Sequence, residues 1–443
     1  MIINEKYTIK QSEDTYFLLP FGQAIAEHKR GVTLNRAGAE LFEALKKGSL
    51  TDDELSENDD FISSLKNLGI IDPVPPVSYS DDLIFQNAEK NILISNKNNR
   101  DVPNIDISVK LTDQVIKETK TDNASDNIFN IAGININIHA DRSLIHEGFD
   151  LFKIPDLAHL AVNKGADKNN DLNIVSDLTP NLNIDIKEYT GVDPRNDFPV
   201  NKESEPLIVN YQLCVYPSKN GNTYDLFFPF NNFVFFANIS CDGKNAELYY
   251  VPASAGPENK KIKNELFHTL RLIFLYKASL ESMFAIHSAS LLYKEKAWLF
   301  SGQSGTGKST HTRLWNKNYD TPLINGDINL ISVAGDSPVI HGTPWCGTSG
   351  IYDNKSYPLG GITLLKQSPE NKVNTLSLPD KLLLVNQRII SPSWTEKMFD
   401  RSWEQTRKAV SDIFVAQLEC RPDDDAAHVM KKAIDDHLLL LNN

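Results

Sequence analysis

The sequence predicts a mixed α/β protein, α+β overall, with a small winged-helix-like domain first, a β-rich region in the middle and a C-terminal domain of strands and helices. Three observations lead to this fold class. Short strands and short amphipathic helices fill residues 1–78, aromatic and alternating apolar strands fill 127–284, and a strand, a glycine-rich loop and a helix follow one another within 285–443. The polar segment 79–126 is expected to be a linker or irregular.

Composition limits the class of protein further. The chain has 443 residues, enough for several cores, and its 41% hydrophobic and 23% charged content is ordinary for a soluble protein. A net charge of −13 argues against a nucleic-acid partner, because no general positive field attracts phosphate backbones. The sequence shows neither a signal segment nor an apolar run of membrane-spanning length, so we expect a cytoplasmic protein without a membrane partner.

The four cysteines are far apart in the sequence and none belongs to a C-x-x-C pair. Their spacing therefore predicts neither a zinc site nor a disulfide framework.

Residues 1–78 carry the signals of two strands and three short helices. The strands are expected at 7–10 and 15–20, separated by a polar turn at 11–14. The helix boundaries are marked by an N-cap, a capping box and two glycines, at Asn35, Thr51 with Glu54, Gly48 and Gly69.

The order of YFLLP, LNRAGAELFEAL, LTDDEL and LGIID resembles the PqqD-like family, the recognition element of ribosomally made, modified peptides. The resemblance implies that residues 1–78 bind the leader of a precursor peptide, which would add as a strand beside the β-ribbon. A winged helix used only for packing is the alternative. The basic residues of this segment do not form a stripe that could face DNA.

The middle of the chain is predicted to be mainly antiparallel β structure. Residues 131–138 alternate between apolar and other residues, which predicts one strand. Further strands are expected at 226–237 and 246–251, a helix at 260–283, and at most one strand, 105–111, within the linker.

Residues 297–315 read AWLFSGQSGTGKSTHTRLW and match every position of G-x-x-x-x-G-K-S/T between an apolar strand and a helix. Glycines let backbone N–H groups approach an anion, and the dipole of the following helix points at the same place. Lys308 can reach the β- and γ-phosphates, and the Ser309 hydroxyl can bind Mg²⁺. The expected nucleotide-binding residues are Gly302, Gln303, Ser304, Gly305, Thr306, Gly307, Lys308, Ser309 and Thr310. The motif predicts ATP and Mg²⁺ as cofactors.

Asp327 follows an apolar strand downstream of the loop, within LINGDINLI. A carboxylate at that place suits a bound Mg²⁺, so Ser309 and Asp327 are the expected metal ligands. An Asn-Gly-Asp turn without a metal is the alternative. His287 lies on the predicted strand before the loop, and helices are expected at 379–390, at 394–412 and from Pro422.

The residues IHSASLLYKEKAWLFSGQSGTGKST, LINGDINLI, HGTPWCG and FVAQLECRPDDDAA resemble the HPr kinase and phosphoenolpyruvate carboxykinase superfamily. The resemblance implies that His287 lies beside the transferred phosphate and that Lys308 and Ser309 are the loop's lysine and hydroxyl. The family has two adjacent aspartates where this chain has Gly326 and Asp327. Asp327 is then both base and metal ligand, or His287 is the base.

Neither the signature loop of true HPr kinases nor an arginine pocket for oxaloacetate is recognisable. HPr is therefore not the expected substrate, and carboxykinase chemistry is not expected either.

Together these features predict an ATP-dependent kinase that phosphorylates a Ser or Thr hydroxyl of a ribosomally made precursor peptide, with Asp327, His287 and Lys308 as catalytic residues. Two alternatives stay open: a kinase for a small molecule such as serine, and a catalytically weak nucleotide-binding protein that delivers peptides. The sequence decides neither whether the chain forms a homo-oligomer nor whether pyrophosphate replaces ATP.

Overall fold

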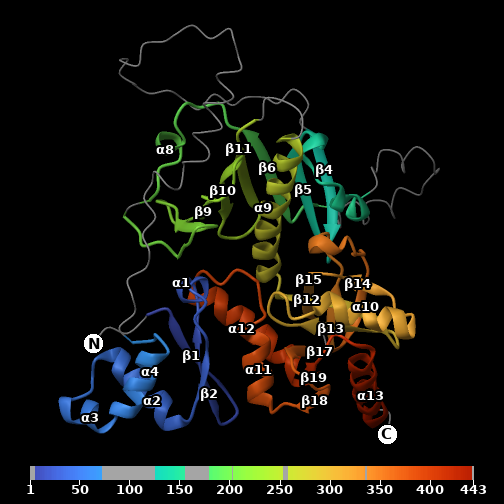
Figure 1. Cartoon of the computed structure of the whole chain (residues 1–443). Coiled ribbons are helices and arrows are strands. Elements are labelled where there is room, and N and C mark those ends of the chain that lie inside the picture. The colour runs from blue at the N-terminus through green and yellow to red at the C-terminus, as the bar shows by residue number, and fades with distance from the viewer. Residues whose placement is uncertain are drawn as a thin grey trace, which may run out of the picture. The chain divides into compact units, whose positions relative to one another are not determined.

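The computed structural model describes residues 5–71, 125–154, 179–201, 203–252, 258–334 and 337–441. The chain forms two compact units, one of residues 1–76 with 278–443 and one of residues 77–277 (Figure 1). The described residues are a mixture of helices and sheets, as the sequence predicts. Nearly all of the predicted linker, with the strand proposed at 105–111, lies outside the described residues.

The N-terminal part of the first unit is a three-stranded sheet with four helices. Its elements are β1 (Tyr7–Ser12), β2 (Thr15–Pro20), α1 (Gln23–Ala26), β3 (Val32–Leu34), α2 (Arg36–Lys47), α3 (Asp52–Glu57) and α4 (Asp59–Asn67). The predicted caps are confirmed: the Asn35 side chain accepts from Gly38 N, Thr51 and Glu54 form the capping box, and Gly48 ends α2 with φ 63°. The sequence did not predict α1 and β3, because elements of four and three residues leave no periodic signal.

The β1–β2 hairpin is tighter than predicted. The strands continue to Ser12 and resume at Thr15, and Glu13 takes a positive φ of 52° in the remaining two-residue turn. The sheet order is β1–β2–β3, so β1 is an edge strand. One face of this sheet, with Tyr7 and Leu18, packs on the domain's own helices, and the other face carries Phe17.

The C-terminal part of the first unit contains a second sheet with helices around it. Its elements are β12 (Met283–Tyr293), β13 (Lys296–Ser301), α10 (Lys308–Tyr319), β14 (Leu323–Asn325), β15 (Ile328–Ala334), β16 (Ser337–His341), η3 (Gly347–Ser349), β17 (Ser356–Gln367), β18 (Lys372–Thr375), α11 (Leu378–Asn386), α12 (Glu396–Ser411), β19 (Phe414–Cys420) and α13 (Asp424–Leu441). The strand order is β13–β12–β15–β16–β17–β19–β18, and β13 also pairs with β17. Five strands therefore close into a ring, in which β12 and β17 each change partner part of the way along.

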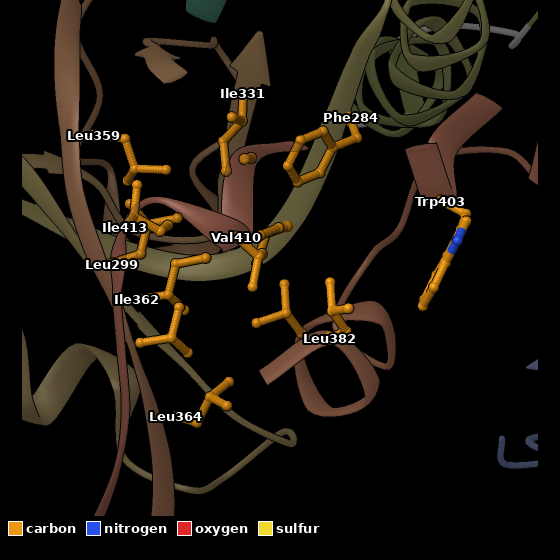
Figure 2. Packing of buried hydrophobic residues seen from close by; sticks show 14 of the residues in the cluster. Phe284, Leu299, Ile331, Leu359, Ile362, Leu364, Leu382, Trp403, Val410 and Ile413 are labelled. Atoms are coloured by element: carbon orange, nitrogen blue, oxygen red, sulfur yellow. The ribbon is translucent and has the colours of Figure 1, made fainter. Parts of the chain in front are cut away.

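One hydrophobic core holds the two parts of the first unit together. Figure 2 shows side chains from the sheet, including Phe284 and Leu299, packed with Leu382 of α11 and Trp403 of α12. Phe17 of β2 belongs to the same cluster, and its ring lies 5.1 Å from that of Trp403 between centroids. In Figure 1, β1 and β2 run beside α12. The N-terminal domain is thus packed directly on the C-terminal half, which the sequence did not predict.

The second unit is built on a sheet with the order β4–β5–β6–β11–β10–β9–β8–β7. Its elements are β4 (Ser125–Ile131), β5 (Ile134–Ala140), η1 (Arg142–Leu144), η2 (Glu147–Phe152), β6 (Leu182–Glu188), α8 (Pro194–Asp197), β7 (Ile208–Val209), β8 (Cys214–Pro217), β9 (Thr223–Phe227), β10 (Val234–Ser240), β11 (Asn245–Tyr250) and α9 (Glu258–Leu280), whose last residues belong to the first unit. Most neighbours are antiparallel, but β6 is parallel to both β5 and β11.

The single strand predicted at 131–138 is wrong. Ala132 and Gly133 form a turn with positive φ values of 56° and 81°, and Ile131 pairs with Ile134 across it. Among the described helices, none combines the length and the apolar composition that a membrane span needs.

Candidate active site

The loop after β13 has the backbone conformation of an anion cradle. Gly305 and Gly307 have φ values of 79° and 102°, which L side chains rarely adopt. A Cβ on Gly302 would lie 2.4 Å from Thr306 Oγ1, so the loop also curls back on itself. The helix α10 begins at Lys308, which places the positive end of its dipole at the loop.

Lys308 is held inside this loop. Its side chain is 9% exposed, and Nζ donates to the carbonyl oxygens of Gly302 at 3.2 Å and Gln303 at 3.3 Å. Burial lowers the pKa of Lys308, Asp327 opposes that shift, and Arg388 adds to it. The ammonium of Lys308 therefore lies where a phosphate bound by the loop would contact it. The charges of Asp327 and Arg388 both act on this ammonium.

The side chains of His287 and Asp327 are in direct contact next to the loop. His287 Nε2 lies 3.0 Å from Asp327 Oδ1, and both side chains are about one-third exposed (36% and 27%). Their meeting follows from the register of β12, where His287 pairs with Ile328 of β15 and the next residue, Ser288, pairs with Ser301 of β13. Ser301 directly precedes the glycine-rich loop. Because β12 changes its partner from β15 to β13 between His287 and Ser288, His287 lies near the start of this loop.

A buried asparagine fixes the backbone of Asp327. Asn325 is 1% exposed, and its Oδ1 accepts from the backbone N–H of Asp327 at 2.9 Å and of Ile328 at 3.0 Å. Its Nδ2 donates to the carbonyl of Thr343 at 3.0 Å, and Ser288 N donates to the carbonyl of Asp327 at 2.9 Å. The predicted Asn-Gly-Asp turn is therefore present, and it presents the carboxylate. This role of Asn325 was not predicted, although the LINGD turn could have indicated it.

The space around Gly326 leaves no room for a second carboxylate. A Cβ on Gly326 would lie 2.0 Å from Ser349 Oγ and 2.4 Å from Ser349 Cβ. On the other side, the backbone of Gly347 packs against the carboxylate, since a Cβ there would lie 3.0 Å from Asp327 Cγ. Asp327 is accordingly the one carboxylate of this turn.

The residues expected to bind Mg²⁺ offer a hydroxyl and a carboxylate, the oxygen ligands that this ion takes. Within the described ranges, no cluster of three or more His, Cys, Asp or Glu side chains could hold a metal alone. Ser309 and Gly326, the neighbour of Asp327, line one cavity of about 10 Å³, which has room for about one water. Mg²⁺ takes few protein ligands and completes its shell with water and substrate phosphates. Asp327 and Ser309 would hold it together with a nucleotide.

The structure thus gathers Lys308, His287 and Asp327 at one end of the ring of strands. Gln303, Ser304, Gly305 and Thr310 lie on the exposed side of the loop. Two contacts to this region were not predicted: Gln367 Nε2 donates to the Gly305 carbonyl at 3.2 Å, and the Arg388 carbonyl accepts from His287 N at 3.1 Å. No local pattern marks either residue, because both reach the loop only through the tertiary fold.

No family model matches the chain, and no characterised protein matches it by sequence. Among solved structures, the Hpr(Ser) kinase/phosphatase from Coxiella burnetii is similar at 10% identity and a TM-score of 0.22, over 36% of this chain and 92% of that chain. A similarity of that size carries no argument about activity. The function has to be inferred from the geometry of the site.

Proposed function

We propose that the chain is an ATP-dependent kinase that transfers the γ-phosphoryl group to a Ser or Thr hydroxyl of a ribosomally made precursor peptide. The observation that carries this proposal is the His287–Asp327 pair at 3.0 Å beside a glycine-rich loop that encloses Lys308. A phosphate cradle next to a proton acceptor is the minimum that hydroxyl phosphorylation requires.

The loop N–H groups, the α10 dipole and Lys308 stabilise the negative charge that spreads over the transferred group. Mg²⁺, when bound, neutralises further charge on the phosphate oxygens. The acceptor proton goes to the His287–Asp327 pair. Within that pair, His287 Nε2 and Asp327 Oδ1 are in direct contact.

The edge strand β1 supports a peptide substrate. Among the described strands, β1 has a neighbour on the β2 side only, so a leader segment can add to its other side through main-chain hydrogen bonds. The Lys46 ammonium donates to the Tyr7 carbonyl at 3.1 Å near the start of this edge. Since the domain shares a core with the catalytic half, a leader bound at β1 would be held at a fixed place relative to Lys308.

The central test is product formation with purified full-length protein, labelled ATP and Mg²⁺. The acceptors are the peptides encoded by short reading frames beside the gene, and free serine. A labelled peptide that Lys308→Ala does not produce supports the proposal. Labelled serine would indicate the small-molecule kinase instead, and ATP binding without any labelled product would indicate the peptide-delivery protein.

A second test addresses the edge strand. In a hairpin with a two-residue turn, the two residues that flank the turn, here Ser12 and Thr15, are hydrogen-bonded to each other. The residue before Ser12, Gln11, therefore directs its backbone N–H away from β2. Gln11→Pro removes that donor, whereas Gln11→Ala keeps it. We expect Gln11→Pro, but not Gln11→Ala, to raise the KM for a leader-bearing precursor. Neither variant should change the KM for a short acceptor without a leader. An equal effect on both substrates would exclude the β1 edge as the leader site.

A further inference from the structure

Arg388 is fixed beside the candidate active site by backbone pairing. The segment that follows α11 runs along the first half of β12: His287 N donates to the Arg388 carbonyl at 3.1 Å, and Ile390 N donates to the Ala285 carbonyl at 2.9 Å. Ile286 and Ile389 form an isolated bridge between these two contacts. Arg388 therefore lies opposite His287 in this antiparallel pairing.

The guanidinium of Arg388 has no counter-ion within the described residues. Its Nε is buried without a hydrogen-bond partner, and no ion pair among the described residues includes this side chain. Burial lowers the pKa of Arg388, and the charge of Arg30 lowers it further. The charge of Arg30 therefore acts on the guanidinium of Arg388.

Arg30 comes from the N-terminal domain, from the loop between α1 and β3. Its carbonyl accepts from the Tyr7 hydroxyl at 3.4 Å. The next residue, Gly31, is packed tightly, because a Cβ there would lie 2.4 Å from Leu19 Cδ2 and 3.3 Å from Leu383 Cδ1 of α11. Packing of this loop on α11, the helix that leads to Arg388, therefore holds Arg30 near it. The side chain of Arg30 is exposed and takes part in no ion pair that the described part of the chain shows.

Two arginines that approach each other without an acid between them repel, and the repulsion is relieved when an anion binds between them. Asp327, a carboxylate at this end of the fold, is already in contact with His287. Guanidinium groups bind the oxygens of phosphoryl groups with two parallel hydrogen bonds, which a buried Nε without a partner favours. An oxyanion is the ligand that this arrangement fits.

We infer that Arg388 and Arg30 form a phosphoryl-binding site next to the glycine-rich loop, to which the N-terminal domain contributes a side chain. The anion is either the γ-phosphoryl group of the nucleotide or an anionic group on the acceptor beside the reacting hydroxyl. The identity of the bound anion rests on the proposed kinase function, but the existence of an anion site at the two arginines does not. The N-terminal domain would then complete the catalytic site as well as bind the leader.

The test uses full-length Arg388→Ala, Arg388→Lys and Arg30→Ala proteins. Matched controls are Arg36→Ala in the same domain as Arg30 and Arg407→Ala in the same half as Arg388, since both of these arginines are paired with carboxylates, Glu40 and Glu404. Binding of ATP, ADP and pyrophosphate is measured by calorimetry with Mg²⁺ present, and thermal melting confirms that each variant is folded.

If the anion is the γ-phosphoryl group, Arg388→Ala weakens ATP binding or slows transfer about 10- to 100-fold, the usual size for a lost hydrogen bond to a charged group, and leaves ADP binding unchanged. If the anion is on the acceptor, ATP binding is unchanged and the KM for the acceptor rises. Arg30→Ala shows the same pattern with a smaller change, and Arg388→Lys retains part of the effect.

Arginine variants that behave like both controls with all ligands would overturn the site. Should the wild-type protein phosphorylate no acceptor, the kinase proposal fails. In that case, weaker binding of ATP or pyrophosphate by the arginine variants than by the controls supports the anion site, and unchanged binding overturns it.

Discussion

Two aspartates of this protein have opposite surroundings: Asp327, between β14 and β15 of one eight-stranded sheet, and Asp225, on β9 of the other. Asp327 is contacted by His287 and presented by a turn whose backbone is bound by Asn325. The side chain of Asp225 makes no hydrogen bond or ion pair in the described part of the chain, and burial raises its pKa to about 6. A carboxylate with partners can stay ionised and serve chemistry, whereas one that is only buried destabilises the fold when it ionises.

The surroundings of Asp225 also differ from those of Asp327. It lines a cavity of about 290 Å³ in the second unit whose walls are largely aromatic and amide side chains, among them Phe236, Asn238 and Tyr249. Lys219, Asp197 and Glu247 are the other charged residues that line the cavity. Asp327, by comparison, lies between the end of one strand and the start of another, where backbone groups are available to hold it.

The largest effect is expected from Lys308→Ala, which should abolish transfer. Loss of a cation that binds the transferred group removes several kcal/mol of transition-state stabilisation. Ser309→Ala should have a similar effect because its hydroxyl is the expected metal ligand. The control is Lys317→Ala on the same helix, whose ammonium is paired with Asp424 on the surface. Turnover of Lys308→Ala close to that of Lys317→Ala would refute the assignment of the loop.

The comparison of the two aspartates is tested by the same substitution at both. Asp327→Asn should bind nucleotide but transfer phosphate at least ~10²-fold more slowly, the usual size of a general-base effect. His287→Ala should give a smaller loss, and Asp225→Asn should leave transfer unchanged. Full activity of Asp327→Asn with an inactive His287→Ala would show that the histidine is the base.

Gly326→Asp tests why only one carboxylate is present in the turn. The added side chain collides with Ser349, and overpacking of this kind costs about 1–3 kcal/mol. Chemical denaturation of Gly326→Asp and of the Gly326→Asp/Ser349→Gly double variant measures the effect. The double variant should recover part of the stability lost in the single one, and an undiminished loss would show that Ser349 is not the obstacle.

The smallest effect concerns Asp225 and pH. The pKa of Asp225 is about 6 in the folded chain and near the ordinary value of 3.8 in the unfolded chain, so the folded state binds the proton more tightly. Stability should therefore fall as the pH rises from about 4 to about 7. Asp225→Asn should lack this component and be more stable than the wild type by about 1–2 kcal/mol at pH 7–8. Denaturation curves at pH 4 and pH 8 measure it, and an equal difference at both pH values would contradict the prediction.

The features that the sequence predicted correctly are those specified within a few residues. Thr51 and Glu54 cap a helix by contacts three residues apart, and the glycines of the phosphate loop take backbone angles that only glycine adopts easily. The turn at Ala132 and Gly133 was missed because isoleucines on both sides of it continue an apolar pattern. Local chemistry is visible in a sequence even where the register of the strands is not.

The features that the sequence could not predict depend on packing between distant segments. Asp327 was expected at the site from its place after an apolar strand downstream of the loop, and His287 from a family resemblance. Their contact depends on the pairing of β12 with β15. Arg388 approaches the loop because the segment after α11 pairs with β12, and Arg30 approaches it because Gly31 packs on that helix. No periodicity or motif encodes either position.

The core shared by the two ends of the chain has a consequence during synthesis. Phe17 leaves the ribosome early, but its partner Trp403 is made only after the whole second unit, residues 77–277, has been translated. At about 5–20 residues per second, that unit alone takes about 10–40 seconds. During this interval the apolar face of the first sheet, with Phe17 and Leu19, has no folded surface to cover it. We expect nascent chains stalled before residue 278 to bind chaperones through this face, and Phe17→Ser to weaken that binding.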